Sequence, residues 1–105
     1  MKVLHLLILL STLLMAGCSN LLYYPNQNRL YYDPGSVGFS PTDVYFTDVA
    51  QRKLHGWWFP SKPMPAKGTV VFFHGNAENL TSHFMHLAWI SAEGYNFFIF
   101  DYPCY

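Results

Sequence analysis

The sequence predicts an α/β protein in which an antiparallel pair of strands is followed by a strand–helix–strand unit. β-rich residues fill 44–49 and 52–59, and the connection between them is so short that the two strands must be antiparallel. Two apolar runs, 69–73 and 96–100, then flank a segment with helical spacing. A strand, a helix and a strand in this order form a right-handed unit with parallel strands.

The segment 79–93 is the predicted helix. Its buried stripe is expected to consist of Leu80, Phe84, Leu87 or Ala88, and Ser91. Asn79 is placed to cap the amino end, and Gly94 is placed to follow the carboxyl end. Asn79 also begins an Asn-Leu-Thr glycosylation signal, but its use as a helix cap is the expected one.

The two apolar runs, 69–73 and 96–100, show no alternation between apolar and polar residues. Both are therefore expected to be buried on both faces, as strands of a parallel sheet are. Alternation along the earlier strand should turn one of Trp57 and Trp58 toward the core and the other toward solvent. The alternative is a binding platform made by both indoles.

The composition excludes several partners. The chain has 105 residues, and its six basic residues balance six acidic ones, so no basic field exists that would recruit nucleic acid. A hydrophobic share of 51% excludes a disordered chain. Two cysteines make no disulfide framework, and no pattern indicates a cofactor.

The first residues have the pattern of a secretory leader. Lys2 gives a positive start, 4–14 is almost entirely apolar, and small residues precede Cys18. The apolar core is too short to span the ~30 Å of a bilayer as a permanent helix. Residues 1–17 are therefore predicted to be a signal peptide.

The segment "LLMAGC" resembles the lipobox of bacterial lipoproteins, with Met15 where that family prefers Leu. The resemblance implies cleavage before Cys18, acylation of Cys18, and the membrane as a partner through the lipid anchor. Ser19 after the cysteine implies the outer membrane, facing the periplasm. The alternative is an ordinary signal peptide with an incidental cysteine.

The mature chain is expected to consist of a tether, 18–41, and a domain, 42–105. The tether has no clear period and is rich in Tyr, Asn, Pro and Gly. Its aromatic residues are expected to pack on the domain, or else to sit at the membrane interface: Tyr23, Tyr24, Tyr31 and Tyr32.

The turn after the run 69–73 is the candidate site. The carboxyl end of a buried parallel strand faces the sheet edge where ligands bind. Gly75 is expected to supply a backbone conformation that other residues avoid. N–H groups in a turn before a helix can point together at a negative oxygen, and one such donor contributes about 3–4 kcal/mol in acyl transfer.

Over about 42–102, "VVFFHGNAENL", the helix and "EGYNFFIFDY" resemble the N-terminal third of an α/β-hydrolase, in the branch of bacterial lipoprotein-type serine hydrolases. In that fold the loop after the third strand supplies one oxyanion N–H. The resemblance implies that His74 and Gly75 shape the loop and that Asn76 donates, with Ala77 as the alternate. It also implies a small ester or amide substrate.

The end of the sequence departs from this family. The family continues after Asp-Tyr with Arg-Gly-Tyr-Gly, where this sequence has Pro103, Cys104 and Tyr105. It contains no Gly-x-Ser-x-Gly, and no residue stands for the family's acid or catalytic histidine. The chain is therefore expected to be a truncated hydrolase, inactive alone, with an incomplete sheet. The alternative is a lipoprotein with a structural or binding role.

Four other residues have side chains that could bind a metal ion or take part in catalysis. His83 and His86 lie three apart and could face one metal ion, but no third ligand is near in sequence, so no metal is expected. The resemblance implies that Asp101 ends its strand and hydrogen-bonds a loop rather than acting as a catalytic carboxylate. Cys104 is expected to be an inert thiol rather than a nucleophile.

Overall fold

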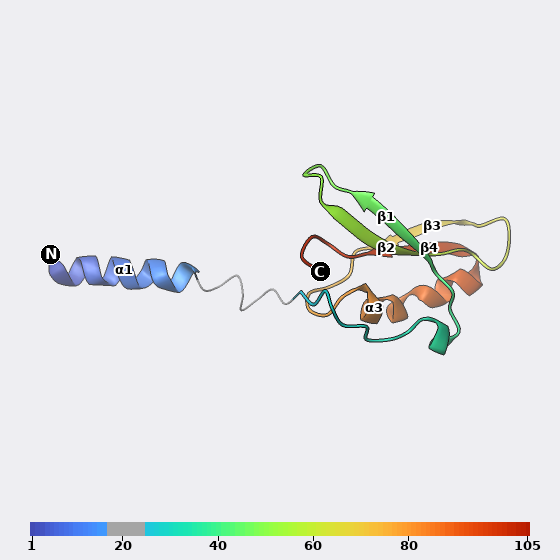
Figure 1. Cartoon of the computed structure of the whole chain (residues 1–105), viewed down its shortest axis with the longest axis horizontal. Coiled ribbons are helices and arrows are strands. Elements are labelled where there is room, and N and C mark those ends of the chain that lie inside the picture. Colours follow the sequence, from blue (N-terminus) through green and yellow to red (C-terminus); the bar gives the residue numbers. More distant parts are fainter. Residues whose placement is uncertain (17–24) are drawn as a thin grey trace.

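The computed structural model describes residues 1–16 and 25–105, with side chains placed for 1–11 and 25–105 (Figure 1). A helix, α1, spans Lys2–Ala16, and a short 3₁₀ turn, η1, spans Gly35–Val37. The strands are β1 (Thr42–Thr47), β2 (Lys53–Phe59), β3 (Gly68–Phe72) and β4 (Tyr95–Phe100).

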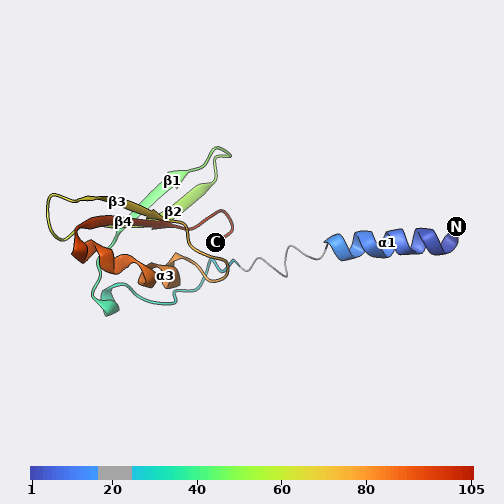
Figure 2. The same cartoon turned by 180° about the vertical axis from the view of Figure 1, so that it is seen from behind.

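The strands form one sheet in the order β1-β2-β4-β3. β1 pairs antiparallel with β2, β2 pairs antiparallel with β4, and β3 pairs parallel with β4. Figure 2 shows the same sheet from behind. The predicted strand pair and the predicted parallel unit are therefore confirmed.

The turn between β1 and β2 is held by one carboxylate. Asp48 accepts hydrogen bonds from the N–H groups of Ala50 and Arg52 and from Arg52 Nε, at 2.7–2.9 Å. These bonds lower the pKa of Asp48, the backbone N–H of Arg52 most of all. Because the turn uses Asp48 onward, β1 ends at Thr47 rather than at the predicted Val49.

The prediction of a single α-helix over 79–93 is wrong, although the segment is helical. The segment is a short α-helix followed by two 3₁₀ helices: α3 (Leu80–His83), η2 (Phe84–His86) and η3 (Ala88–Glu93). Leu87 leaves the helical region, with φ −135°, and separates the last two. Ala88 and Ser91 are both buried, and a 3₁₀ helix places residues three apart on one face.

Both predicted helix ends are confirmed. Asn79 Oδ1 accepts the N–H of Thr81 at 2.9 Å, which caps α3. Gly94 ends η3 with φ 100°, and its N–H donates to Ile90 O. A residue with a side chain would be strained in that left-handed conformation.

The core lies between this helical segment and one face of the sheet. Its buried members are Trp57, Phe59, Leu80, Phe84, Ala88, Ile90, Phe97 and Ile99. Phe84 is central, because its ring lies 5.4 Å from that of Trp57 and 5.7 Å from that of Phe59. Phe39, which the sequence analysis assigned to the tether, packs edge-on against both Phe59 and Phe84.

The opposite face of the sheet carries touching aromatic rings, which we call the aromatic face: Phe46, Trp58, Phe73, Phe98 and Phe100. Trp57 faces the core and Trp58 this face, as strand alternation predicts. The ring of Phe98 lies across Gly56, where a Cβ atom would approach it to 2.7 Å.

The expectation that both apolar strands are buried on both faces is wrong. Val71 is 47% exposed and Phe73 is 67% exposed, while Phe98 and Phe100 are half-buried. The described helical segments next to the sheet cover its core face (Figures 1 and 2), and β3 forms an edge of the described sheet. An apolar run indicates that both sides of a strand carry apolar side chains, but it does not indicate whether another element covers each side.

Part of the tether lies against α3. Asn79 Nδ2 donates to the carbonyls of Asn26 and Arg29 at 2.6 and 2.8 Å, and Tyr31 N donates to Thr81 Oγ1 at 3.0 Å. Tyr31 is half-buried, which confirms its predicted packing, whereas Tyr32 is 52% exposed. Tyr23, Tyr24 and Cys18 lie outside the described residues.

Within the described ranges, 1–16 and 25–105, no helix has both the length and the apolar character needed to cross a membrane.

The open edge of β3 and the aromatic face predict self-association, because an unprotected strand edge is a template for pairing. We expect the chain without residues 1–17 to sediment as concentration-dependent oligomers. Val71→Lys should raise the monomer fraction by placing a charge on this edge. Val49→Lys, at a fully exposed turn position, is the matched control and should change nothing. A monomeric parent chain with one cooperative unfolding transition would contradict the prediction.

Candidate functional site

His74 follows β3 and is the buried centre of the candidate site. The residue is 4% exposed, whereas Gly75 and Asn76 beside it are exposed. Its ring stacks on His83, with centroids 4.9 Å apart and planes 9° apart, and on Tyr102, with centroids 4.5 Å apart. Packing against these two rings therefore holds the imidazole at the centre of the site in one orientation.

Asp101 joins three ends of the fold at this point. Its Oδ1 lies 3.0 Å from His74 Nε2 and accepts the N–H of Leu80 at 2.7 Å. The ends of β3 and β4 and the start of α3 thus meet on one oxygen. Asp101 ends its strand and hydrogen-bonds the loop, as the sequence analysis expected.

The His74 main chain is held as well. The Tyr102 hydroxyl donates to His74 O at 2.6 Å. His74 Nδ1 lies 2.8 Å from Gly75 O, within the same turn. The carbonyls of His74 and Gly75 are therefore both held by side chains, those of Tyr102 and His74.

The strained backbone of the loop is not at Gly75. Gly75 has no positive φ, and a Cβ atom there would meet His83 at an ordinary 3.9 Å. Ala77 and Glu78 instead have φ values of 65° and 58°. The expectation that Gly75 supplies a backbone conformation that other residues avoid is therefore wrong, and a side chain holds the segment that does have it.

That side chain is His83, which the sequence analysis considered only as a metal ligand. Its Nε2–H donates to Ala77 O at 3.0 Å, across the turn. A non-glycine residue in this region costs about 1–2 kcal/mol, and the hydrogen bond offsets part of that cost. The described residues contain no group of three side chains that could hold a metal ion.

The last residues of the chain reach the same loop. The Tyr105 hydroxyl donates to Asn76 Oδ1 at 2.9 Å, and its ring lies 5.1 Å from that of His74. Cys104 is exposed and has φ 76°, at the place where the resembled family has glycine. Cys104 thus adopts a backbone conformation that favours glycine, although it carries a side chain.

The loop offers backbone donors rather than a nucleophile with its base. Asn76 N–H and Ala77 N–H lie between a strand end and the start of a helix, where N–H groups favour an anionic oxygen. Ser82, next to His83, is buried, and its hydroxyl donates to Asn79 O at 3.1 Å. In chemical terms the arrangement suits stabilisation of a developing negative charge.

A second histidine–carboxylate pair lies on the β1–β2 hairpin. Asp43 Oδ1 is 2.6 Å from His55 Nε2 and accepts the indole N–H of Trp57 at 3.0 Å. The hydrogen bond to His55 is the main cause that lowers the pKa of Asp43. The side chains of His55 and Asp43 are 33% and 58% exposed, so this is a surface pair.

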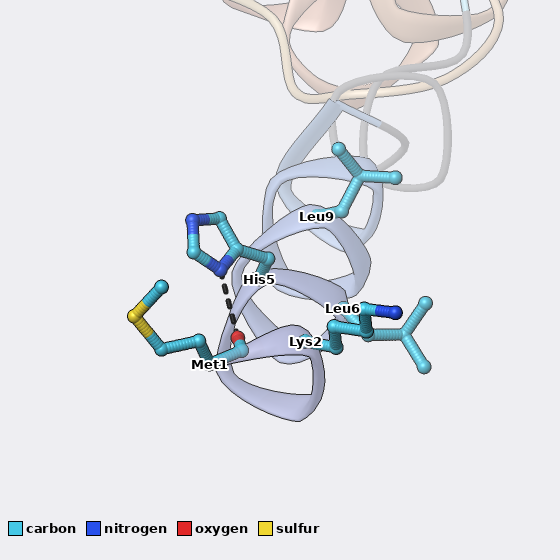
Figure 3. Close-up of a pocket in the computed structure, with 5 residues that line it drawn as sticks. All are labelled: Met1, Lys2, His5, Leu6 and Leu9. Carbon is cyan, nitrogen blue, oxygen red and sulfur yellow. Dashed lines mark hydrogen bonds between the residues drawn. The ribbon is translucent and has the colours of Figure 1, made fainter.

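The hollow shown in Figure 3 lies on α1 and is not a binding site. Its lining consists of Met1, Lys2, His5, Leu6 and Leu9, all from the first turns of one helix. His5 Nδ1–H donates to Met1 O at 2.7 Å within this stretch. A hollow with walls from a single helix has no second element to close it.

Tyr102→Phe tests the support of the His74 backbone. Loss of the hydrogen bond to His74 O should lower the free energy of unfolding by about 0.5–1.5 kcal/mol at neutral pH. Burial is the main cause that raises the pKa of Tyr102 above its usual 10.0, and Tyr105 and Asp101 add to it. A raised folded-state pKa gives stability that is present below about pH 10 and is lost as the pH rises through the folded value.

The wild-type chain should therefore lose its advantage over Tyr102→Phe as the pH rises from about 9 to about 11. Urea unfolding across this range measures the difference. Tyr32→Phe, at a 52% exposed position, is the matched control. Parallel stability curves for wild type and Tyr102→Phe would refute the assignment.

The chain is similar in sequence to part of several longer proteins. No protein-family model matches the chain. It is 35% identical over 86 residues to the uncharacterized protein YfhR of Escherichia coli K12, which covers 79% of this chain and 29% of that protein. YfhR of Salmonella typhi is 32% identical over 103 residues, covering 95% and 34%. The chain thus spans about a third of the length of the curated relatives it matches.

Solved structures match the domain. An esterase of Pyrococcus furiosus superposes with a TM-score of 0.58 at 27% identity, over 79% of this chain and 31% of the esterase. A soluble variant of monoglyceride lipase from Saccharomyces cerevisiae, in complex with a substrate analogue, gives 0.50 at 22% identity, over 73% and 24%, and shows the fold alone. The described chain therefore has the fold of the N-terminal portion of an α/β-hydrolase, as the sequence predicts.

Proposed function

We propose that this chain is the N-terminal part of a membrane-anchored serine hydrolase and supplies one side of its oxyanion site. The observation that carries the proposal is the loop after β3, which Asp101, His74 and Tyr102 fix at the carboxyl edge of two parallel strands. Ligands bind at this edge in open α/β sheets. Asn76 N–H is the donor, and Ala77 N–H is the alternate.

The substrate class follows from what such a donor stabilises. An oxyanion develops when a nucleophile attacks the carbonyl of an ester or an amide, and a fixed N–H in a site that excludes water lowers that barrier. Among the structural neighbours, one is named an esterase and another a monoglyceride lipase. We therefore assign a small ester or amide as the substrate of the whole hydrolase.

The chain alone should be inactive, because acyl transfer needs a nucleophile within reach of a base. The sequence has no Gly-x-Ser-x-Gly, and Ser82 is engaged with Asn79 O. We expect the purified full chain to hydrolyse short activated esters no faster than buffer and to take no fluorophosphonate label. A label mapped to any serine of residues 19–105 would show that the chain is an enzyme by itself.

The positive test lies in the DNA that follows codon 105. A reading frame there should encode Gly-x-Ser-x-Gly, and the joined product should take the fluorophosphonate label. In that product Asn76→Pro, which removes the N–H, should lower kcat by about 10²–10³-fold. Asn76→Ala keeps the N–H and serves as the matched control. A DNA sequence without the motif would favour the alternative of a structural or binding lipoprotein.

The anchor is a second part of the proposal. We assign residues 1–17 as a cleaved signal peptide and Cys18 as the acylated residue, with the protein held at the outer membrane and facing the periplasm. The apolar helix α1 and the "LLMAGC" segment support this assignment. Stable attachment requires more than one acyl chain or a second signal.

Cys18→Ser should abolish acylation and should leave the leader uncleaved. Cys104→Ser, which changes the exposed cysteine of the domain, is the matched control and should keep the lipid. The mass of the N-terminal peptide and the distribution between membrane and soluble fractions measure both effects. An unmodified mature N-terminus in the wild-type protein would overturn the assignment.

A further inference from the structure

We propose that residues 26–32 form a strap that turns one end of the domain toward the bilayer, the end that carries the His74 loop. We call this end the loop end. The strap binds the start of α3, next to the loop, so the tether leaves the domain there. Substrate then reaches the site from the membrane side. This inference deepens the proposed function and rests on it for the lipid anchor at Cys18.

Two residues at the start of α3 hold the strap. Asn79 Nδ2 donates to Asn26 O at 2.6 Å and to Arg29 O at 2.8 Å. Thr81 Oγ1 accepts the Tyr31 N–H at 3.0 Å, and Thr81 O accepts the N–H of the next residue at 3.2 Å. Asn79 is 3% exposed, so its bonds are shielded from water and costly to break. The strap is therefore a fixed part of the domain.

The strap decides at which end of the sheet the tether leaves. β1 begins at Thr42 beside Trp58, and β2 then ends beside Phe97, early in β4. Because β3 and β4 both run toward the His74 loop, this place lies at the opposite end of the sheet. Figures 1 and 2 show residues 25–41 running along the helical segments from the loop end to that opposite end. The strap therefore moves the exit of the tether to the loop end.

The strap also shortens the free part of the tether. Eight residue steps separate Cys18 from Asn26. A chain spans at most about 3.3–3.6 Å per residue, so Asn26 lies within about 30 Å of the proposed anchor. Without the strap the first held residue is Phe39, which packs on Phe59 at the opposite end, and the limit rises to about 75 Å. A short tether that leaves at the loop end keeps that end nearer the bilayer.

The turn between β1 and β2 lies at the loop end as well. Gly56 pairs with Phe100 at the end of β4, so the turn that precedes β2 extends past this strand (Figure 1). The apex of the turn carries Val49, which is fully exposed. Asp48 in the same turn is paired with Arg52 at 2.7 Å. An apolar apex with a paired acid can enter the headgroup region without burying an unpaired charge.

The experiment compares how near two labelled positions lie to a bilayer. The full chain, purified from membranes, is placed in vesicles of phosphatidylethanolamine and phosphatidylglycerol at a low protein-to-lipid ratio. An acceptor dye labels the headgroups of the outer leaflet. The donor dye is on Cys104, which is exposed at the loop end, or on Met64→Cys in a Cys104→Ser chain. Met64 is 78% exposed and precedes β3, at the opposite end.

We expect energy transfer to cause a larger loss of donor fluorescence at Cys104 than at position 64. An equal or smaller loss at Cys104 in chain that floats with the vesicles would overturn this inference alone. Chain that does not float would overturn it together with the anchor. No hydrolysis is measured, so failure of the proposed reaction would be seen separately.

Asn79→Asp combined with Thr81→Ala releases the strap without removing the helix cap. The new carboxylate still accepts the N–H of residue 81, and Asp is as good a cap as Asn. It has no N–H for the carbonyls of Asn26 and Arg29, and Thr81→Ala removes the acceptor of the Tyr31 N–H. Circular dichroism checks that the helical content is kept.

In the released variant the loss of fluorescence should fall at Cys104 and rise at position 64, because the tether then leaves near Phe39. Asn28→Asp adds the same charge at an exposed residue of the strap and is the matched control. It should leave both losses as they are in the wild-type chain. Losses in the released variant that equal those of the wild-type chain would refute the strap.

Discussion

The carboxylate of Asp101 is the contact on which the site depends. Parallel pairing of β3 with β4 brings both carboxyl ends to one edge, so the residue after β4 meets the residue after β3. One oxygen then accepts from His74 and from the first N–H of α3. Charge-assisted bonds of this kind are stronger than neutral ones. Strand, helix and loop are therefore fixed relative to one another before any substrate is present.

Local patterns in the sequence were enough to predict the sheet, and they failed where tertiary contacts decide. The short connection before β2 and the caps at Asn79 and Gly94 are set by residues close in sequence, and all three were predicted. The break at Leu87, where φ is −135°, was not predicted, because no residue near it in the sequence is a glycine or a proline that would signal it. The exposure of β3 depends on which elements cover it, and its own residues carry no signal for that.

In the candidate loop, too, local features could be predicted from the sequence and tertiary contacts could not. Its place after β3 could be predicted, because a His-Gly pair between an apolar run and a helix resembles the loop after the third strand of an α/β-hydrolase. The supports could not, since His83 reaches Ala77 O across a turn whose positive φ values occur at Ala77 and Glu78 rather than at glycine. Tyr102 could have been suspected from its position after Asp101. Its bond to His74 O required the structure.

The strain in this loop argues that its shape is formed in advance. Two successive residues with positive φ, each costing roughly 1–2 kcal/mol, persist only where surrounding contacts determine them. Those contacts come from Asp101 and His83, and Asn79 binds the carbonyls of Asn26 and Arg29 in the tether. Donors held in place before reaction cost no reorganisation when charge develops. The shape of the loop is therefore set before any ligand is present, which is what the oxyanion role in the proposed function requires.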